Sequence, residues 1–392
     1  MTSGPEGSPQ PDDKLREGTS LSSELIFEVL RKRMTFAKST PDRGFDPLTA
    51  SAEELERFKL PPRPDPRQNP RAFANWRRAM SPPLRFVSPE NLEILLKDPT
   101  ALFRVAEDRR HHQFESAADS SQEVSRNWSG AYVRDNPGER YVSLQGTWVV
   151  PRPYPPPPAV SGDPWPEGTF YSSCWVGLDG HDPASLSLPQ MGIGNSVSVP
   201  DAVTTDPNNL TVSVNAWWQW WVKGDSGNHP IEILPSIFPV HPGDIIIVQL
   251  NVLNSTTVRF VLKNQSTGQV FPPFDVTVPV LTNLNRAVAV EGRTAEWIIE
   301  RPTKVASIDL RPFCDYGAVT FYGCNAQVQT TPGGSVTEDR QLQRARLIRL
   351  ADWTQPGGTP FQPGMQQPGI VVSSAAPEGD DSVLVYYRGN GP

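Results

Sequence analysis

Two carboxylates stand in one strand-like segment, Thr294–Glu300, which reads TAEWIIE. Side chains alternate along a β-strand, so Glu296 and Glu300 point to one face while Trp297 points to the other. A carboxylate whose pKa lies near the working pH can take a proton from water and hand it to a leaving amine. The segment therefore predicts two candidates for acid–base chemistry, with an ordinary solvated strand face as the structural alternative.

Other catalytic constellations are weak. No metal-ligand spacing relates the five histidines, which are His111, His112, His181, His229 and His241. The segment Gly224–Gly227 (GDSG) imitates serine- and aspartic-protease motifs, but the partner motifs that either mechanism needs are absent, so a turn is favoured. No phosphate loop or dinucleotide fingerprint occurs. We expect no metal and no cofactor, and any catalysis must use carboxylates and side-chain amides.

The elements that would position these groups are strands. From about Asn127 onward the chain is rich in β-branched and aromatic residues, bounded by Gly, Pro, Asn and Asp. The strand-like runs are YVSLQGTWVV, SSCWVGLDG, NLTVSVNAWWQWWV, IEILP, DIIIVQLNVL, TTVRFVLKN, TAEWIIE, GAVTFYG and SVLVYY. Many short strands with almost no helical periodicity between them predict an all-β fold, an antiparallel two-sheet sandwich.

Residues 1–122 differ in composition, being charged and rich in arginine and proline. The predicted elements are helices at Ser23–Arg33, at Ser51–Phe58 (opened by a Ser51/Glu54 capping box), at Asn91–Leu96 and at Ala101–Asp108, with an extended stretch at Leu60–Pro70. Apolar density is too low for an independent core. We expect a partly helical N-terminal extension, either a pro-segment or an appendage on a domain spanning 123–392. Its arginine clusters, such as Arg71, Arg77 and Arg78, would pair with an acidic cleft and release it in acid.

Bulk properties exclude several classes of protein. The net charge of −7 and pI near 5.4 leave no basic surface for nucleic acid. No apolar run approaches the ~20 residues that a bilayer span needs, and no signal peptide is visible. Of the three cysteines, Cys174, Cys314 and Cys324, the last two either bridge a hairpin or stay free thiols.

Seven segments together resemble the eqolisin family of glutamic peptidases and its bacterial relatives. They are NWSGAYV (Asn127–Val133), CWVGLDG (Cys174–Gly180), LPQMG (Leu188–Gly192), NAWWQWW (Asn215–Trp221), KNQSTGQ (Lys263–Gln269), TAEWIIE (Thr294–Glu300) and PFCDYGAVTF (Pro312–Phe321). Their order follows the family, and the match covers about residues 125–388. The resemblance implies a concanavalin A-like sandwich with a cleft on one concave face.

The resemblance also implies a catalytic pair. The family's catalytic glutamate falls on Glu300 and its catalytic glutamine on Gln190, with Pro189 interposed after Leu188. Glu300 would deprotonate water and then protonate the leaving nitrogen, while the Gln190 amide would stabilise the oxyanion without a repelling charge. Glu296, on the same strand face, is the rival for the role of base.

Further positions match residues that line the family's cleft and are expected to bind substrate. They are Trp128, Trp175, Asp179, Gly180, Asn215, Trp217, Gln219, Trp221 and Glu296. Asp179 either orients the dyad or closes a local turn, and the tryptophans either stack on substrate or belong to the core. The family usually carries Asp and Glu where Asn215 and Gln219 stand, and fewer neighbouring carboxylates predict activity at less extreme acidity.

These features together predict an endopeptidase that cleaves polypeptides at acidic pH, monomeric and, by family resemblance, secreted. The alternative is a non-catalytic, lectin-like sandwich that binds peptide or carbohydrate, because tryptophan-lined concave faces also serve that function.

Overall fold

A computed structural model of the chain describes residues 28, 32–42, 44–88, 103–105, 108–109, 117–118, 122–158, 160–223, 229–278, 288–304, 310–330, 333–338, 345–352 and 370–389. The predicted helix Asn91–Leu96, the turn Gly224–Gly227 and nearly all of the predicted helix Ser23–Arg33 lie outside these residues. So do His111 and His112.

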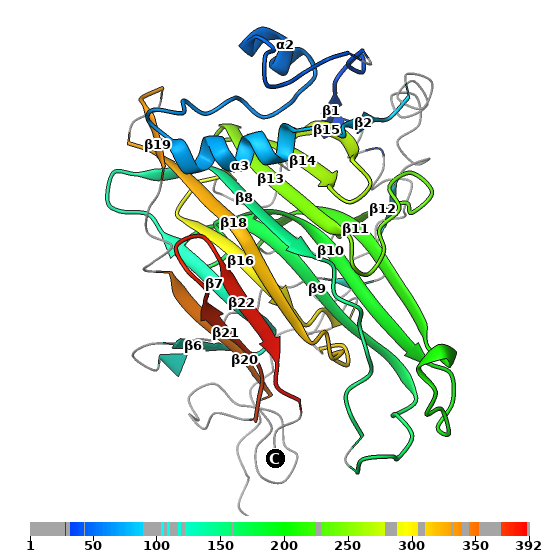
Figure 1. The fold of residues 1–392 in the computed structure, drawn as a ribbon. Coiled ribbons are helices and arrows are strands. Elements are labelled where there is room, and N and C mark those ends of the chain that lie inside the picture. Colours follow the sequence, from blue (N-terminus) through cyan, green and yellow to red (C-terminus); the bar gives the residue numbers. More distant parts are fainter. Residues whose placement is uncertain are drawn as a thin grey trace, which may run out of the picture.

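Two antiparallel sheets pack face to face (Figure 1). The back sheet runs in the order β1 (Met34–Phe36), β15 (Gln269–Thr277), β14 (Thr257–Asn264), β13 (Ile245–Asn254), β8 (Arg140–Val149), β18 (Ala318–Gln329) and β19 (Val336–Glu338), with β2 (Arg85–Phe86) parallel to β15. Alternation of buried β-branched residues with polar ones along these strands gives each a core face and an outer face. The prediction of an all-β two-sheet sandwich is confirmed.

The front sheet carries the predicted chemistry. Its order is β3 (Phe103–Val105), β12 (Ile231–Ile233), β11 (Thr211–Val222), β10 (Ser187–Val199), β9 (Gly168–Leu178), β16 (Thr294–Glu300), β7 (Trp128–Arg134), β20 (Arg346–Asp352), β21 (Ile370–Pro377) and β22 (Val383–Tyr387). β22 joins β18, so β18 belongs to both sheets. Strand β6 (Gln122–Ser125) lies parallel to β20 and pairs with β5 (Ala117–Ala118). Strand β4 (Asp108–Arg109) pairs only with β17 (Thr303–Lys304), just beyond β16.

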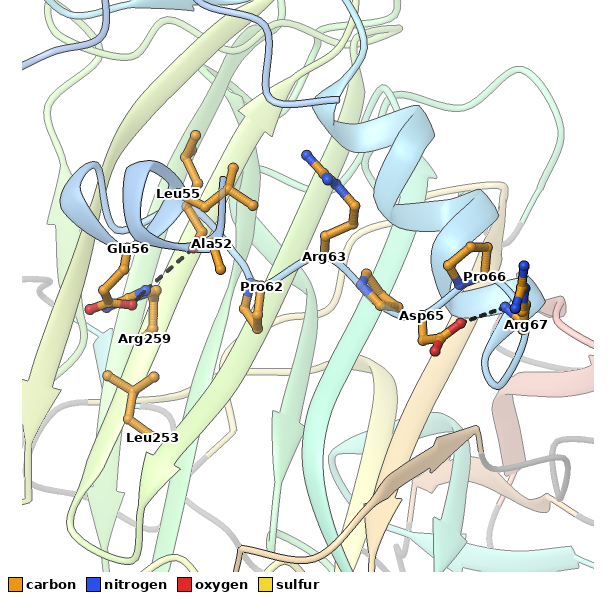
Figure 2. A pocket seen from close by; sticks show the side chains of 12 residues that line it. Ala52, Leu55, Glu56, Pro62, Arg63, Asp65, Pro66, Arg67, Leu253 and Arg259 are labelled. Carbon is orange, nitrogen blue, oxygen red and sulfur yellow. Dashed lines mark hydrogen bonds and ion pairs between the residues drawn. The ribbon is translucent and has the colours of Figure 1, made fainter. Parts of the chain in front are cut away.

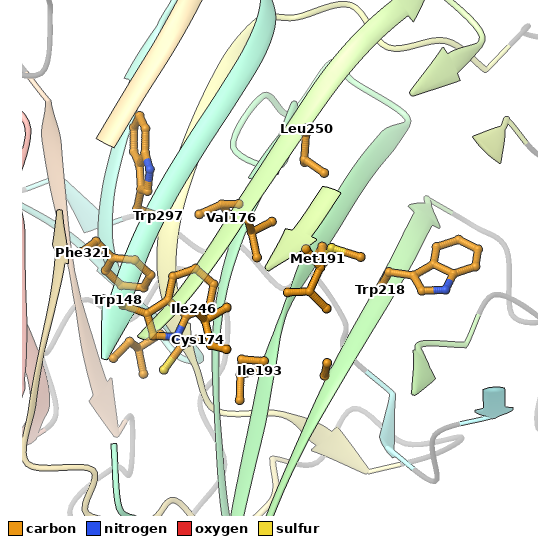
Figure 3. Packing of buried hydrophobic residues seen from close by; sticks show 14 of the residues in the cluster. Trp148, Cys174, Val176, Met191, Ile193, Trp218, Ile246, Leu250, Trp297 and Phe321 are labelled. Carbon is orange, nitrogen blue, oxygen red and sulfur yellow. The ribbon is translucent and has the colours of Figure 1, made fainter. Parts of the chain in front are cut away.

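The core lies between the sheets (Figure 3). Trp148, Ile246 and Leu250 come from the back sheet and pack with side chains of the front sheet such as Val176 and Met191. On the front-sheet side, Trp297 is fully buried, and its indole Nε1 donates to the carbonyl of Gln145 at 2.9 Å. This bond joins the two sheets. It also gives the buried indole N–H a partner, without which its burial would cost free energy.

The extension forms a partial third layer on the outer face of the back sheet. Helices α2 (Ala52–Arg57) and α3 (Pro70–Met80) bury Leu55 and Trp76 against Ile247. The predicted Ser51/Glu54 capping box is present and opens α2. The predicted helix at Ala101–Asp108 is wrong, because Phe103–Val105 pairs with the exposed edge of β12 and Phe103 enters the sandwich core.

Two buried cations hold this layer. Arg259 donates to both oxygens of Glu56 on α2 at 2.8 and 2.9 Å, and to Asp275 on the neighbouring strand. Lys263 donates to the carbonyls of Ala79 and Ser81 at the carboxyl end of α3, where a helix favours a cation. Burial lowers the Lys263 pKa to about 8.

A cavity of about 620 Å³ lies under this layer, away from the predicted site (Figure 2). It is bounded by α2, by the proline-rich segment 60–67 and by Leu253 and Arg259 of the back sheet. The ion pair between Glu56 and Arg259 closes one side of it. None of the predicted site residues lines this cavity.

The described arginines of these clusters lie in two places: Arg71 lies away from the predicted site, whereas Arg104 stands in register with Glu232 and Trp217 on the sheet that carries the site. Arg71 pairs with Glu338 and Asp380, and Arg104 pairs with Glu232. The expected pairing of Arg71 with cleft acids is therefore wrong; its helix lies on the opposite face of the sandwich.

All three cysteines are buried free thiols, so Cys314 and Cys324 do not form a bridge. Within the part of the chain that the structure describes, no helix is long and apolar enough to cross a membrane.

Candidate active site

The outer face of the front sheet arranges the predicted residues in three rows across neighbouring strands. The register of β11, β10, β9, β16 and β7 fixes each row. One row runs Gln219, Gln190, Gly177, Glu296, Tyr132; the next runs Trp217, Gly192, Trp175, Ile298, Gly130; the third runs Asn215, Gly194, Ser173, Glu300, Trp128. The alternation predicted for TAEWIIE and NAWWQWW is thus found, with Trp297 and Trp218 turned into the core.

Glu300 is held by two side-chain donors. The indole Nε1 of Trp175 donates to its Oε2 at 2.8 Å, and the Asn127 amide donates to its Oε1 at 3.3 Å. Trp128 packs edge-on against Trp175, with ring centroids 4.9 Å apart. The carboxylate is 2% exposed. These donors fix its orientation on the sheet face.

Gln190 is also 2% exposed, and its Nε2 donates to Oε1 of Gln219 at 3.1 Å. An amide nitrogen carries two donors, so one remains for another acceptor. Among the described residues its Oε1 has no hydrogen-bond partner. A Cβ on the adjacent Gly177 would come within 2.7 Å of Leu188 and 3.2 Å of the Gln190 Cβ, so glycine is needed for this close approach.

Glu296 lies opposite Gln190 across Gly177. It is fully buried, and its Oε1 accepts from the backbone N–H of His181 at 3.0 Å. Within the described chain Oε2 has no partner. Burial raises the Glu296 pKa to about 8, so this carboxyl is neutral in acid.

The structure does not bring Gln190 and Glu300 into direct contact. They are two strands and four residues apart in register. With about 4.8 Å between strands and about 3.3 Å per residue, their Cα atoms lie roughly 16 Å apart in a flat sheet, against roughly 10 Å for Gln190 and Glu296. Trp175 lies on the diagonal between Gln190 and Glu300. Trp175 therefore separates the two side chains, and the shorter distance from Gln190 keeps Glu296 in contention as the base.

Asp179 anchors the start of the strand that carries both glutamates. Its backbone φ is +69°, and its carboxylate accepts the N–H groups of Glu291, Gly292 and Arg293 at 2.6–3.1 Å. Burial raises the pKa of Asp179 to about 7, although these three hydrogen bonds act to lower it. The expectation of a local turn was too narrow, since the bonds reach a loop more than 100 residues along the chain. A Cβ at Gly180 would press on Leu188 and Trp128 at 3.0 Å.

The tryptophans of this face pack together. Trp128, Trp175, Trp217 and Trp221 form one buried cluster with Leu188 and Ile298, among others. Trp217 donates from Nε1 to Ser173 Oγ at 3.0 Å. Asn215 is less buried, and in the described part of the chain its Nδ2 has no partner. The rings are therefore not open platforms in this conformation.

Three residues beside the site were missed from sequence. Glu123, Tyr132 and His181 form a partly buried hydrogen-bonded group at the end of the Gln190 row. His181 directly follows the GLDG motif, but motif spacing says nothing of a carboxylate 58 positions upstream. Among the described residues no cluster of three or more His, Cys, Asp or Glu has the arrangement of a metal site.

The fold and these side chains define a class: β-sandwich proteins with a carboxylate–amide site on one sheet face. Residues 126–352, more than half of the chain, match the model of the Peptidase A4 family. The chain belongs to this family and is a glutamic-type peptidase.

The chain is also similar to several solved structures. SCP-B, a member of the eqolisin family of peptidases bound to the tripeptide Ala-Ile-His, is 18% identical, with 67% of this chain and 99% of SCP-B covered and a TM-score of 0.42. Scytalido-glutamic peptidase with a transition-state analogue inhibitor is also 18% identical, with the same coverage and a TM-score of 0.44. Aspergilloglutamic peptidase from Aspergillus niger is 23% identical over 56% of this chain and 99% of its own, with a TM-score of 0.36. No curated protein matches the chain. Similarity at these sequence identities does not identify the catalytic residues of this chain.

Proposed function

We propose that the chain is an endopeptidase that hydrolyses polypeptides at acidic pH, with Glu300 as general base and acid and Gln190 as oxyanion donor. The observation that carries this is the fixed carboxylate of Glu300, held by Trp175 and Asn127 on the same sheet face as Gln190. Two neutral donors orient a base without supplying the proton that it must accept.

In the proposed reaction, the substrate binds between the two side chains once the site has opened. Water lies against Glu300, which removes its proton as the oxygen attacks the scissile carbonyl. The free N–H of Gln190 donates to the developing oxyanion, while its other N–H stays on Gln219. Glu300 then protonates the departing nitrogen. The bond between carbon and nitrogen breaks, a carboxylic acid and an amine leave, and no covalent intermediate forms.

Substrate entry requires the site to open. Glu300 and Gln190 are each 2% exposed and Glu296 is fully buried, so a polypeptide cannot reach them in the described conformation.

Digestion of an unfolded protein tests the proposal. Wild type, Glu300→Gln and a surface control, Glu167→Gln, are incubated with denatured casein or haemoglobin from pH 2 to 6. We expect wild type and the control to digest it, and Glu300→Gln to be slower by about 10²–10⁴-fold, the usual value of a general base. Unaltered digestion by Glu300→Gln contradicts the mechanism, and an intact substrate with wild type would indicate a non-catalytic binding protein.

A further inference from the structure

A partly buried group of three polar side chains, Glu123, Tyr132 and His181, lies beside the site. The Nε2 atom of His181 is 2.7 Å from Oε2 of Glu123, and the Tyr132 hydroxyl donates to the other oxygen of Glu123 at 2.5 Å. The rings of Tyr132 and His181 stack, with centroids 3.6 Å apart and planes 14° from parallel. Strand β6, strand β7 and the turn after β9 thus meet in one contact.

The direction of the central hydrogen bond follows from charge. Burial alone would raise the Glu123 pKa, but hydrogen bonds from His181 and Tyr132 hold it below the usual value. The group is therefore a carboxylate over most of the pH range, and a carboxylate only accepts. His181 must carry a proton on Nε2 and donate it to Glu123.

Charged residues on the neighbouring strands surround the pair of His181 and Glu123. Arg346 of β20 reaches Glu123 at 3.5 Å. Arg134 of β7 lies near His181 and reaches Asp182 at 4.0 Å. Glu296 accepts from the His181 backbone, and burial lowers the His181 pKa although Glu123 opposes this.

The contact between His181 and Glu123 is connected to the row of residues that contains Gln190 and Glu296. Glu296 receives the backbone N–H of His181 and stands in register with Tyr132 on one side and Gly177 on the other. Gln190 follows beyond Gly177. The side chain of His181 therefore fixes the turn whose backbone fixes Glu296, and Glu296 fills the row opposite Gln190.

We propose that His181, held by the Glu123 carboxylate, is a positioning residue that keeps Glu296 and the Gln190 row in working geometry. The inference rests on the proposed function. Glu123 lies before residues 126–352, the region that matches the family, so this support comes from a strand outside the family's core region.

The pair gives a pH signature that a purely structural contact would not. The Glu123 pKa is depressed, so its contribution is present above its ordinary value and is lost as pH falls through the depressed value. In wild type, kcat should then decline at the acid end as the contact is lost. In Glu123→Gln the charge is absent at every pH, so the kcat of this variant should not show that decline.

The test compares kcat and KM of wild type, Glu123→Gln, His181→Gln and His181→Ala from pH 2 to 7. Asp135→Asn serves as a control, because the Asp135 carboxylate is also nearly buried and pairs with Arg293. We expect Glu123→Gln to have about tenfold lower kcat at pH 5 with KM within twofold, and the ratio to wild type to approach one at the lowest pH. His181→Gln, which can still donate to Glu123, should retain more activity than His181→Ala. The inference is overturned if the ratio of kcat between Glu123→Gln and wild type does not vary with pH. It is also overturned if His181→Gln is no more active than His181→Ala.

Two checks keep the outcomes distinct. If Glu123→Gln does not fold, as judged by its thermal unfolding transition, Tyr132→Phe replaces it, because that variant keeps the ring stack and removes one donor to Glu123. If Glu300→Gln is as active as wild type, the proposed function fails. If Glu300→Gln is inactive while the Glu123 ratio stays flat, only the positioning role fails.

Discussion

At the scale of residues, the two glutamates of one strand are held by different kinds of donor. Glu300 accepts from the side chains of Trp175 and Asn127, whereas Glu296 accepts from the backbone of His181. Side chains can shift when substrate enters, but a backbone donor in a turn cannot easily do so. We therefore expect Glu300 to act as the base and Glu296 to stay fixed as a neutral carboxyl.

Glu296 should make the protein less stable as pH rises. Its folded pKa of about 8 lies above the ordinary 4.5, so between these values the folded state binds more protons than the unfolded state. The free energy of unfolding therefore falls with rising pH in that window. Urea unfolding at pH 4.5 and 7.5 should show a smaller loss for Glu296→Gln than for wild type. Equal losses in both proteins would show that Glu296 is ionised at little cost.

Strand alternation predicts which residues share a face, and it did so for Glu296 and Glu300. It cannot predict the register with other strands, which depends on partners far along the chain. That is why Glu296, not Glu300, is found directly across from Gln190, and why the contact between Glu123 and His181 was missed.

At the scale of elements, prolines and glycines hid true secondary structure. Strand β15 contains Pro272 and Pro273, yet both fall at a register shift against β14, where a ladder donor is not required. Strand β10 is continuous although it contains Pro189 and several glycines, so only its motif was noticed from the sequence. Helix α3 was not predicted, although Pro70 stands at its start, a common first residue of helices.

The ion pairs of Arg259 should be essential for the attachment of α2. Its side chain is fully buried and bonded to Glu56 and Asp275, so Arg259→Met leaves a nearly buried Asp275 with Lys59 as its remaining cation. Loss of one partner of such a pair typically costs about 3 kcal/mol. Chemical denaturation should show a loss of this order, against little for the exposed Arg67→Met. A loss below about 1 kcal/mol would mean that the pair only offsets its own desolvation.

At the scale of the whole molecule, residues 44–88 of the extension lie on the face of the sandwich opposite the site, whereas β3 and β4 of the extension lie at the front sheet. The cluster containing Trp76 and Ile247 covers the back sheet, and the cluster containing Trp175 lies on the front sheet. Of the two expectations for the extension, the contacts of residues 44–88 favour an appendage that stays in place.

Residues 44–88 should therefore remain attached after acid treatment. If the chain is incubated in acid and then passed through a size-exclusion column, N-terminal sequencing and mass measurement should find this segment with the sandwich, even where the chain has been cut. A chain that begins at residue 122 should unfold at lower temperature, because Trp76 and Leu55 no longer cover Ile247. A stable, fully active protein that lacks the segment would instead make it a removable pro-segment.

The central claim is that Glu300, and not its neighbour on the same face, carries the proton. The most direct measurement is the kcat of Glu300→Gln beside that of Glu296→Gln on one peptide substrate at the acidic optimum. We predict a loss of about 10²–10⁴-fold for Glu300→Gln and less than about tenfold for Glu296→Gln, which replaces an already neutral carboxyl. The reverse order would contradict the account and make Glu296, the residue across Gly177 from Gln190, the catalytic base.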